Sequence, residues 1–107
     1  GIAQGVGAAL FEEYVYNDEG QPLVSLFSDY LIPGIHEVPI AEKGFIQTPS
    51  PVAPLGAKGC GEGAIHTTPA TVICAINDAL APLGVQMRET PASPNRVWTL
   101  MAGAASA

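Results

Sequence analysis

The most chemically suggestive side chains of this sequence lie in residues 54–63, PLGAKGCGEG. One lysine, one cysteine and one carboxylate, Lys58, Cys60 and Glu62, stand among four glycines in this loop. Glycine at such density is typical of a backbone that needs positive φ or that another group approaches closely. Glu62 is the only acid in the loop, and a fixed carboxylate is a common general base. Glu62 is therefore the candidate catalytic residue.

The loop leads into a strongly apolar helix. Thr68 is the expected N-cap, and Pro69 is expected at the first helical position, where its missing N–H is not needed. Backbone N–H groups gather at such a helix N-terminus and favour negative charge. The simpler interpretation is that Glu62 only complements the helix dipole at a tight turn. The loop matches neither the Walker motif nor the G-x-G-x-x-G fingerprint, so nucleotide binding is disfavoured.

The cysteines and histidines suggest two further chemistries. A Cys60 nucleophile with His66 as its base is conceivable because a helix N-terminus favours a thiolate, but no third residue orients the pair. Cys60, Cys74, His36 and His66 lack the paired spacing of a zinc site, so no metal ligands are predicted. Two reduced thiols in a cytoplasmic protein fit the sequence better than a disulfide.

The composition indicates one small domain that does not cover its own surface. The chain has 107 residues, enough for a single domain with a modest core. Only 13% of the residues are charged, against the usual ~25%, so we expect another chain or domain to cover part of the surface. A net charge of −6 without a basic cluster disfavours nucleic acid and anionic membranes as partners. No apolar run approaches the ~20 residues of a membrane span, and no signal-peptide pattern is present.

Residues 1–13, GIAQGVGAALFEE, repeat apolar side chains at every fourth position and predict a buried helix. Two glycines within it, each less favourable than alanine by ~1 kcal/mol, suggest that a neighbour or a ligand packs against its backbone. Gln4 is the one polar side chain before Glu12. It is either a satisfied buried amide or a hydrogen-bonding group aimed at a ligand, and the local pattern alone favours the buried amide.

Two more helices are predicted in the second half of the chain. From Pro69 to Leu83 apolar residues repeat at intervals of three and four, and Gly84 follows as the C-cap. A last helix is predicted over Asn95–Met101, after Ser93 and Pro94, with the side chains of Val97, Trp98 and Met101 facing inward.

Strand signals lie between these helices. The sequence Asn17-Asp18-Glu19-Gly20 is typical of a hairpin turn and predicts a two-stranded hairpin of residues 14–16 with 23–26. Residues 37–47 are expected to be extended, and residues 85–89 to form a short strand. The predicted fold class is therefore α+β, with about three helices packed on a small, mostly antiparallel sheet.

Five blocks of the sequence resemble a known family. They are GIAQGVGAALFEE at 1–13, FSDYLIP at 27–33, TPSPVAPLGAKGCGEG at 48–63, INDALAPLGV at 76–85 and SPNRVW at 93–98. In this order and spacing they resemble the C-terminal segment of the large, molybdenum-binding subunit of the xanthine dehydrogenase / aldehyde oxidase family. The closest resemblance is to its carbon monoxide dehydrogenase-like and isoquinoline oxidoreductase-like bacterial branch. Residues 1–107 would then form the C-terminal portion of a molybdopterin-binding domain, a single and incomplete domain.

The resemblance implies roles for three residues. Glu62, the glutamate of the family's GxKGxGE loop, would be the active-site base, Gln4 would contact the molybdopterin cofactor, and the backbone at Gly61 would line the same pocket. The implied reaction is hydroxylation of an electrophilic carbon in an aldehyde, an N-heterocycle or a related small molecule, with water as the oxygen source. Electrons would leave through iron–sulfur clusters and usually FAD on partner chains. Cys60 departs from the family pattern, which usually has a small aliphatic residue there.

These observations lead to one expectation and one alternative. Because the sequence begins at Gly1 inside a helix-like run, we expect a piece or a trimmed subunit of a molybdenum hydroxylase large subunit that is not active alone. Its partners would be the remainder of that subunit, the iron–sulfur and flavin subunits and a small-molecule substrate, in an oligomer. The alternative is a non-catalytic remnant or interaction module with the same fold that binds no molybdenum.

Overall fold

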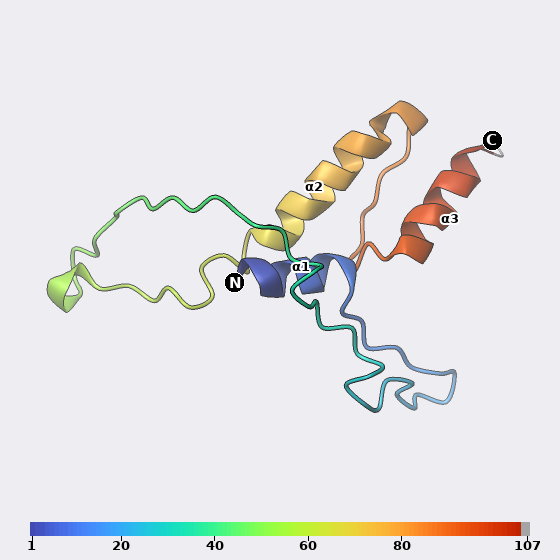
Figure 1. The fold of residues 1–107 in the computed structure, drawn as a ribbon, viewed down its shortest axis with the longest axis horizontal. Helices are drawn as coiled ribbons and strands as arrows, with labels where there is room; N and C mark the ends of the chain where they lie inside the picture. The colour runs from blue at the N-terminus through green and yellow to red at the C-terminus, as the bar shows by residue number, and fades with distance from the viewer. Residues whose placement is uncertain (106–107) are drawn as a thin grey trace.

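The computed structural model describes residues 1–105 as three α-helices joined by long segments without regular structure (Figure 1). The elements are α1 at Ile2–Leu10, the short 3₁₀ helix η1 at Pro54–Gly56, α2 at Thr68–Leu80, the 3₁₀ helix η2 at Ala81–Leu83 and α3 at Pro94–Ala105. In Figure 1, α1 lies beside the start of α2. Residues 40–63, here called the arm, extend away from this junction and return to it.

Helix α1 packs closely against the start of α2, and its glycines make this approach possible. A Cβ atom added to Gly5 would lie 2.4 Å from the Cβ of Thr68, closer than side chains pack. A Cβ atom added to Gly1 would lie 2.9 Å from the Cβ of Ala64. Val6 is buried on the predicted apolar face. The expectation that a neighbour packs against this helix is confirmed, and the neighbour is the N-terminal end of α2.

Helix α2 begins one residue earlier than its sequence predicts. Thr67 is the N-cap residue, and Thr68 already lies inside the helix. The Thr68 hydroxyl donates to the carbonyl of Ala64 at 2.7 Å, which ties the helix start to the preceding turn. The predicted helix does not reach Leu83 as one element, because its last turn tightens into η2. Gly84, with φ at 68°, ends it in the left-handed conformation that the sequence predicts.

The linker between α2 and α3 is not the predicted strand. The amide of Asn77 on α2 accepts from the N–H of Met87 at 2.7 Å and donates to its carbonyl at 3.0 Å. A few residues on, the N–H of Ala92 donates to the carbonyl of Ala9 in α1 at 2.6 Å. The Asn77 side chain thus satisfies both backbone groups of Met87, which a neighbouring strand would otherwise bind.

The predicted α+β class is wrong, because no strand or sheet forms within residues 1–105. The turn at Asn17 does form, with its N–H donating to the carbonyl of Gln21 at 2.9 Å, but the ladder beyond it is a single isolated bridge between Tyr16 and Pro22. A two-stranded hairpin this short is marginal without a third strand. Residue 37 belongs to a turn and residue 38 to a bend, and residues 39–47 have no regular structure, so no strand forms over residues 37–47.

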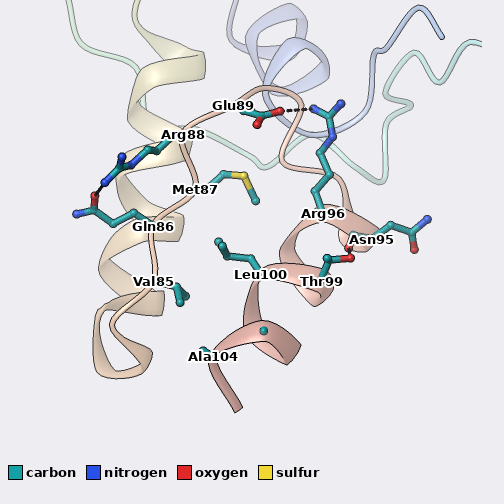
Figure 2. A pocket seen from close by; sticks show the side chains of 11 residues that line it. Val85, Gln86, Met87, Arg88, Glu89, Asn95, Arg96, Thr99, Leu100 and Ala104 are labelled. Atoms are coloured by element: carbon teal, nitrogen blue, oxygen red, sulfur yellow. Dashed lines mark hydrogen bonds and ion pairs between the residues drawn. The ribbon is translucent and has the colours of Figure 1, made fainter. Parts of the chain in front are cut away.

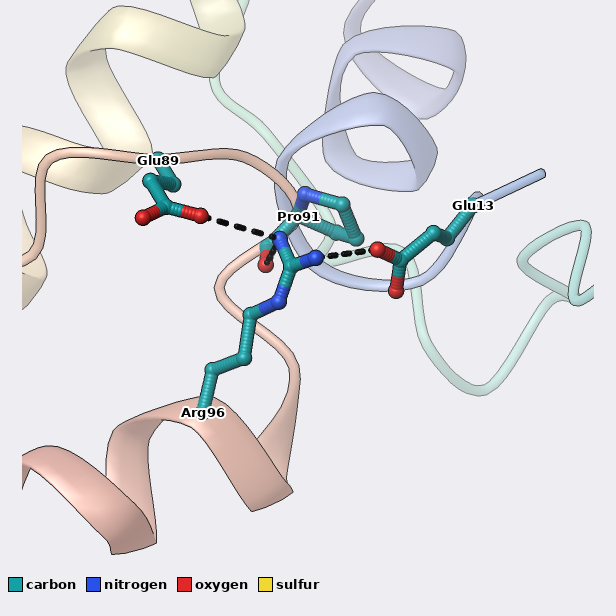
Figure 3. A network of polar contacts seen from close by, with 4 residues as sticks. All are labelled: Glu13, Glu89, Pro91 and Arg96. Atoms are coloured by element: carbon teal, nitrogen blue, oxygen red, sulfur yellow. Dashed lines mark hydrogen bonds and ion pairs between the residues drawn. The ribbon is translucent and has the colours of Figure 1, made fainter. Parts of the chain in front are cut away.

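Helix α3 is attached to the rest of the chain mainly through Arg96 (Figure 3). The guanidinium donates to the carbonyl of Pro91 at 3.1 Å, forms an ion pair with Glu13 just after α1, and lies 3.9 Å from a carboxylate oxygen of Glu89. The expected inward orientation of Trp98 is wrong, since this residue is 70% exposed. One cation thus joins three segments, while the apolar side of α3 has little of this chain to cover it.

The molecule exposes more surface than a folded chain of its size should. Its radius of gyration is 17.8 Å, against about 13 Å expected for a compact chain of this length. Its accessible surface is 8373 Å², about 2,800 Å² above the value expected from its mass. The buried apolar residues are Val6, Ala9, Leu80, Met87 and Ala92. The excess surface agrees with the expectation that another chain or domain covers part of this one.

Candidate functional site

Glu62 lies where two turns overlap just before α2. The N–H of Gly63 donates to the carbonyl of Cys60 at 3.3 Å, and the N–H of Ile65 donates to the carbonyl of Glu62 at 3.2 Å. The Glu62 side chain is exposed, and no hydrogen bond or ion pair joins its carboxylate to another of the described residues. The turns therefore fix the backbone of this glutamate and leave its carboxylate available to a group from outside the chain.

Gln4 lies on α1, close to the residues that meet the Glu62 turn. It is exposed, so the interpretation as a buried, satisfied amide is wrong. A Cβ atom added to Gly1 would lie 2.9 Å from the Cβ of Ala64, so these two residues are close neighbours. Gln4 lies about one helical turn beyond Gly1, and Glu62 lies two residues before Ala64. Both residues therefore lie near the N-terminal ends of α1 and α2.

The glycines of the loop differ in what this chain requires of them. Gly56 has φ at 67° and ends η1, so a positive φ accounts for it. Gly59 and Gly61 lie outside the left-handed region, and apart from their chain neighbours none of the described residues comes within 4 Å of a Cβ added to either. The space beside the backbone at Gly61 is thus open, and nothing in the described residues fills it.

The other polar residues of the loop do not form a second site. The Lys58 ammonium donates to the hydroxyl of Thr48 at 3.1 Å. Cys60 and Cys74 are free, exposed thiols, and no hydrogen bond connects Cys60 with His66 in residues 1–105. Within the same residues, no group of three or more His, Cys, Asp or Glu side chains is placed to hold a metal ion.

One pair that the sequence does not predict fastens residues 27–33 to the segment just after α1. The Tyr30 hydroxyl donates to a Glu12 carboxylate oxygen at 2.8 Å. This hydrogen bond, with smaller contributions from burial and from the charge of Glu12, raises the pKa of Tyr30 above its ordinary 10.0. Both residues lie within blocks already singled out by pattern, but a pairing across eighteen positions has no local signal.

A cavity of about 800 Å³ lies between the linker and α3 (Figure 2). Its lining combines apolar side chains, Met87 and Leu100 among them, with the polar side chains of Gln86, Asn95 and Thr99. None of the predicted site residues lines it. We therefore assign it no part in the chemistry of the Glu62 turn.

Sequence comparison places similar stretches in known enzymes. The family described as a molybdopterin cofactor-binding domain matches residues 1–39. The nicotine 6-hydroxylase large subunit of Paenarthrobacter nicotinovorans is 40% identical over 97 residues, which are 91% of this chain and 12% of the relative. The carbon monoxide dehydrogenase large chain of Hydrogenophaga pseudoflava is 33% identical over 98 residues, again 12% of that protein. The chain thus spans about an eighth of the length of these relatives.

Two solved structures are similar to this chain in backbone as well as in sequence. Quinoline 2-oxidoreductase from Pseudomonas putida 86 matches with a TM-score of 0.89 and 42% identity, over 94% of this chain and 13% of that one. Reconstituted carbon monoxide dehydrogenase from Oligotropha carboxidovorans matches with a TM-score of 0.90 and 30% identity, over 99% of this chain and 13% of that one. An alignment over 99% of the chain necessarily includes the arm.

Proposed function

Because this chain belongs to the family of molybdopterin-binding large subunits that includes carbon monoxide dehydrogenase and xanthine dehydrogenase, we propose that it supplies the general base and two cofactor contacts of a molybdenum hydroxylase. In this proposal Glu62 is the base, and Gln4 and the backbone at Gly61 contact the cofactor. The chain is 12% of the length of its relatives, so the activity would be that of the longer assembly.

One observation carries this assignment: the close contact between Gly1, the N-cap residue of α1, and Ala64. Without it, Gln4 and Glu62 would be two exposed residues nearly sixty positions apart with nothing to relate them. With it, an amide and a carboxylate lie at one end of the α1–α2 junction, beside a backbone that is open at Gly61. A general base must be held within hydrogen-bond reach of the proton it takes, which requires such a fixed backbone.

The residues present fit a molybdopterin group. The Gln4 amide can both donate and accept hydrogen bonds, as the polar edge of a pterin requires. The open space at Gly59 and Gly61 allows a bulky ligand to approach the backbone without meeting a side chain. When bound, this cofactor would supply the redox chemistry, as the acceptor of two electrons from the substrate.

The part of this chain in the chemistry is then proton transfer. The Glu62 carboxylate would take a proton from the water-derived oxygen as that oxygen attacks the substrate carbon. Removing a positioned general base lowers turnover by 10² to 10⁴-fold in typical enzymes. The turns on either side of Glu62 hold its backbone in place, so little ordering of the chain remains when substrate binds.

For substrate we propose an N-heterocycle. The two relatives with 40% and 42% identity are named for nicotine and quinoline, both aromatic nitrogen heterocycles, whereas the carbon monoxide dehydrogenases share 30 to 33%. For partners we propose the remainder of the large subunit, together with iron–sulfur and FAD subunits that carry the electrons away.

Replacing Glu62 with Gln in the complete large subunit tests the proposal. We expect turnover of an N-heterocycle to fall at least 10²-fold while the molybdenum content stays that of the wild type. Glu42→Gln is the matched control, since Glu42 is an exposed glutamate on the same arm. Turnover like the wild type in Glu62→Gln would refute the assignment of the base. Wild-type protein without molybdenum would favour the non-catalytic remnant instead.

A further inference from the structure

Residues 48–58, at the far end of the arm, include η1 and form a closed turn that is separate from the three α-helices (Figure 1). We call this segment the arm tip. The N–H of Ser50 donates to the carbonyl of Gly56 at 3.1 Å, and the Ser50 hydroxyl accepts from the N–H of Ala53 at 3.2 Å. The bond between Lys58 and Thr48 joins the two ends of the segment. The arm tip is therefore shaped by its own hydrogen bonds, although no helix supports it.

This ordered tip presents two large apolar side chains to solvent. Val52 is 91% exposed and Leu55 is 104% exposed. Leu55 also has φ at 59° and ψ at 10°, the left-handed conformation that leucine adopts rarely and glycine or asparagine adopt readily. A residue chosen for this turn alone would be glycine or asparagine. The leucine is thus unfavourable both in its backbone and in its exposure, which indicates that its side chain contacts something outside this chain.

The arm tip is also one of the two anchors of the Glu62 loop. On the other side, the loop is held at Ala64, just before α2, which lies against Gly1, just before α1. On the arm side, Lys58 is followed by Gly59, Cys60 and Gly61, and Cβ atoms added to these two glycines would meet none of the described residues beyond their chain neighbours. Whatever fixes the arm tip therefore fixes this end of the loop.

We propose that the arm tip is an apolar plug that seats Leu55 and Val52 in a pocket of the remaining large-subunit polypeptide, and that this seating positions Glu62. The proposal rests on the proposed function, because it names that polypeptide as the occupant. The structural matches support this choice. They include the arm, and in each matched chain this stretch is 13% of a single polypeptide whose remainder is available to surround it. The excess surface of this chain is what such a remainder would cover.

The first test measures whether the tip is covered. In the complete large subunit with bound molybdenum, Leu55→Cys is treated with a maleimide, and labelling at each cysteine is followed by peptide mass spectrometry. Asp18→Cys, in the exposed polar turn at residues 17–20, is the control. We expect labelling at position 55 to be at least tenfold slower than at position 18, and equally fast after denaturation. Equal rates in the folded complex would overturn the proposal. Protection that appears in the 107-residue chain alone, and grows with its concentration, would assign the plug to a second copy.

The second test asks whether the seating positions Glu62. If Leu55 serves only the turn, Leu55→Asn should be neutral, because asparagine tolerates this φ. If it is a plug, Leu55→Asn should lower kcat at least tenfold with molybdenum retained, while Leu55→Met keeps most of the activity. A kcat unchanged by Leu55→Asn would overturn the positioning role. These results differ from a failure of the proposed function, which would appear as missing molybdenum or as an active Glu62→Gln variant.

Discussion

Replacing Gly5 with alanine should test the close contact between α1 and α2, on which the arrangement of Gln4 and Glu62 depends. Helix propensity alone favours the substitution by ~1 kcal/mol. The structure opposes it, because the new Cβ would lie 2.4 Å from the Cβ and 2.7 Å from the Cγ2 of Thr68. Carbon atoms pack at about 3.5 to 4.0 Å, so the two helices must separate locally by about 1 Å.

Such overpacking typically lowers stability by about 1–3 kcal/mol. After subtraction of the propensity gain, the free energy of unfolding should fall by roughly 1 kcal/mol. Gly103→Ala is the matched control, since Gly103 lies in α3 and, among the described residues, a Cβ atom added to it would meet no side chain within 4 Å. That variant should be stabilised by up to about 1 kcal/mol, so the two substitutions should differ by about 2 kcal/mol.

The measurement is urea-induced unfolding of the 107-residue chain, followed by far-UV circular dichroism. The dependence of the free energy of unfolding on urea concentration is fitted with one slope for all variants. Opposite signs for Gly5→Ala and Gly103→Ala would support the contact. If both variants are stabilised to a similar extent, α1 and α2 do not approach each other at Gly5. In that case nothing holds Gln4 near the Glu62 turn.

Two further predictions concern contacts that the sequence did not reveal. In Glu12→Ala the pKa of Tyr30 should fall back toward 10.0, as read from tyrosinate absorbance, because the hydrogen bond that raises it is lost. Because the pKa of Tyr30 is higher in the folded state than in the unfolded state, its hydrogen bond to Glu12 stabilises the wild-type fold below pH 10, and this stabilisation is lost as the pH rises through the folded pKa. The free energy of unfolding should therefore fall more steeply above pH 10 in the wild type than in Glu12→Ala. The same alkaline unfolding curve for both proteins would contradict the prediction. Asn77→Ala should lower the free energy of unfolding by about 2 kcal/mol, because the N–H and carbonyl of buried Met87 both lose their partner. Asp78→Ala, on the exposed side of the same helix, should change it by less than about 0.5 kcal/mol, and equal losses would count against the Asn77 contact.

The helices could be predicted because their signals are local. The apolar repeat of α2 and the glycine after it specify a helix and its end within one stretch of chain, and Gly84 ends η2 as expected. The sheet could not be predicted correctly, since strand pairing depends on partners. The turn at Asn17 formed without a ladder beyond it, and Asn77 took the place of a partner strand for Met87.

The candidate site was predictable in its residues but not in its surroundings. A motif can single out Glu62 and Gln4, and it cannot say that both side chains would be exposed. Trp98 shows the same limit. Its position in an apolar helical pattern predicts burial, and burial requires a neighbour that residues 1–105 do not supply.

The glycines separate what this chain determines for itself from what it leaves to others. Thr68 explains Gly5, and a left-handed backbone explains Gly56. Gly59 and Gly61 have neither a close neighbour nor a positive φ, although glycine costs backbone entropy in the folded state. They lie just before Glu62 in the sequence, between the arm tip, where Leu55 is exposed and has a positive φ, and α2, which packs against α1. Leu55, Gly59 and Gly61, which no contact within the described residues explains, thus lie close together in the sequence. This is the pattern expected when one external surface, formed by cofactor and polypeptide together, contacts all three.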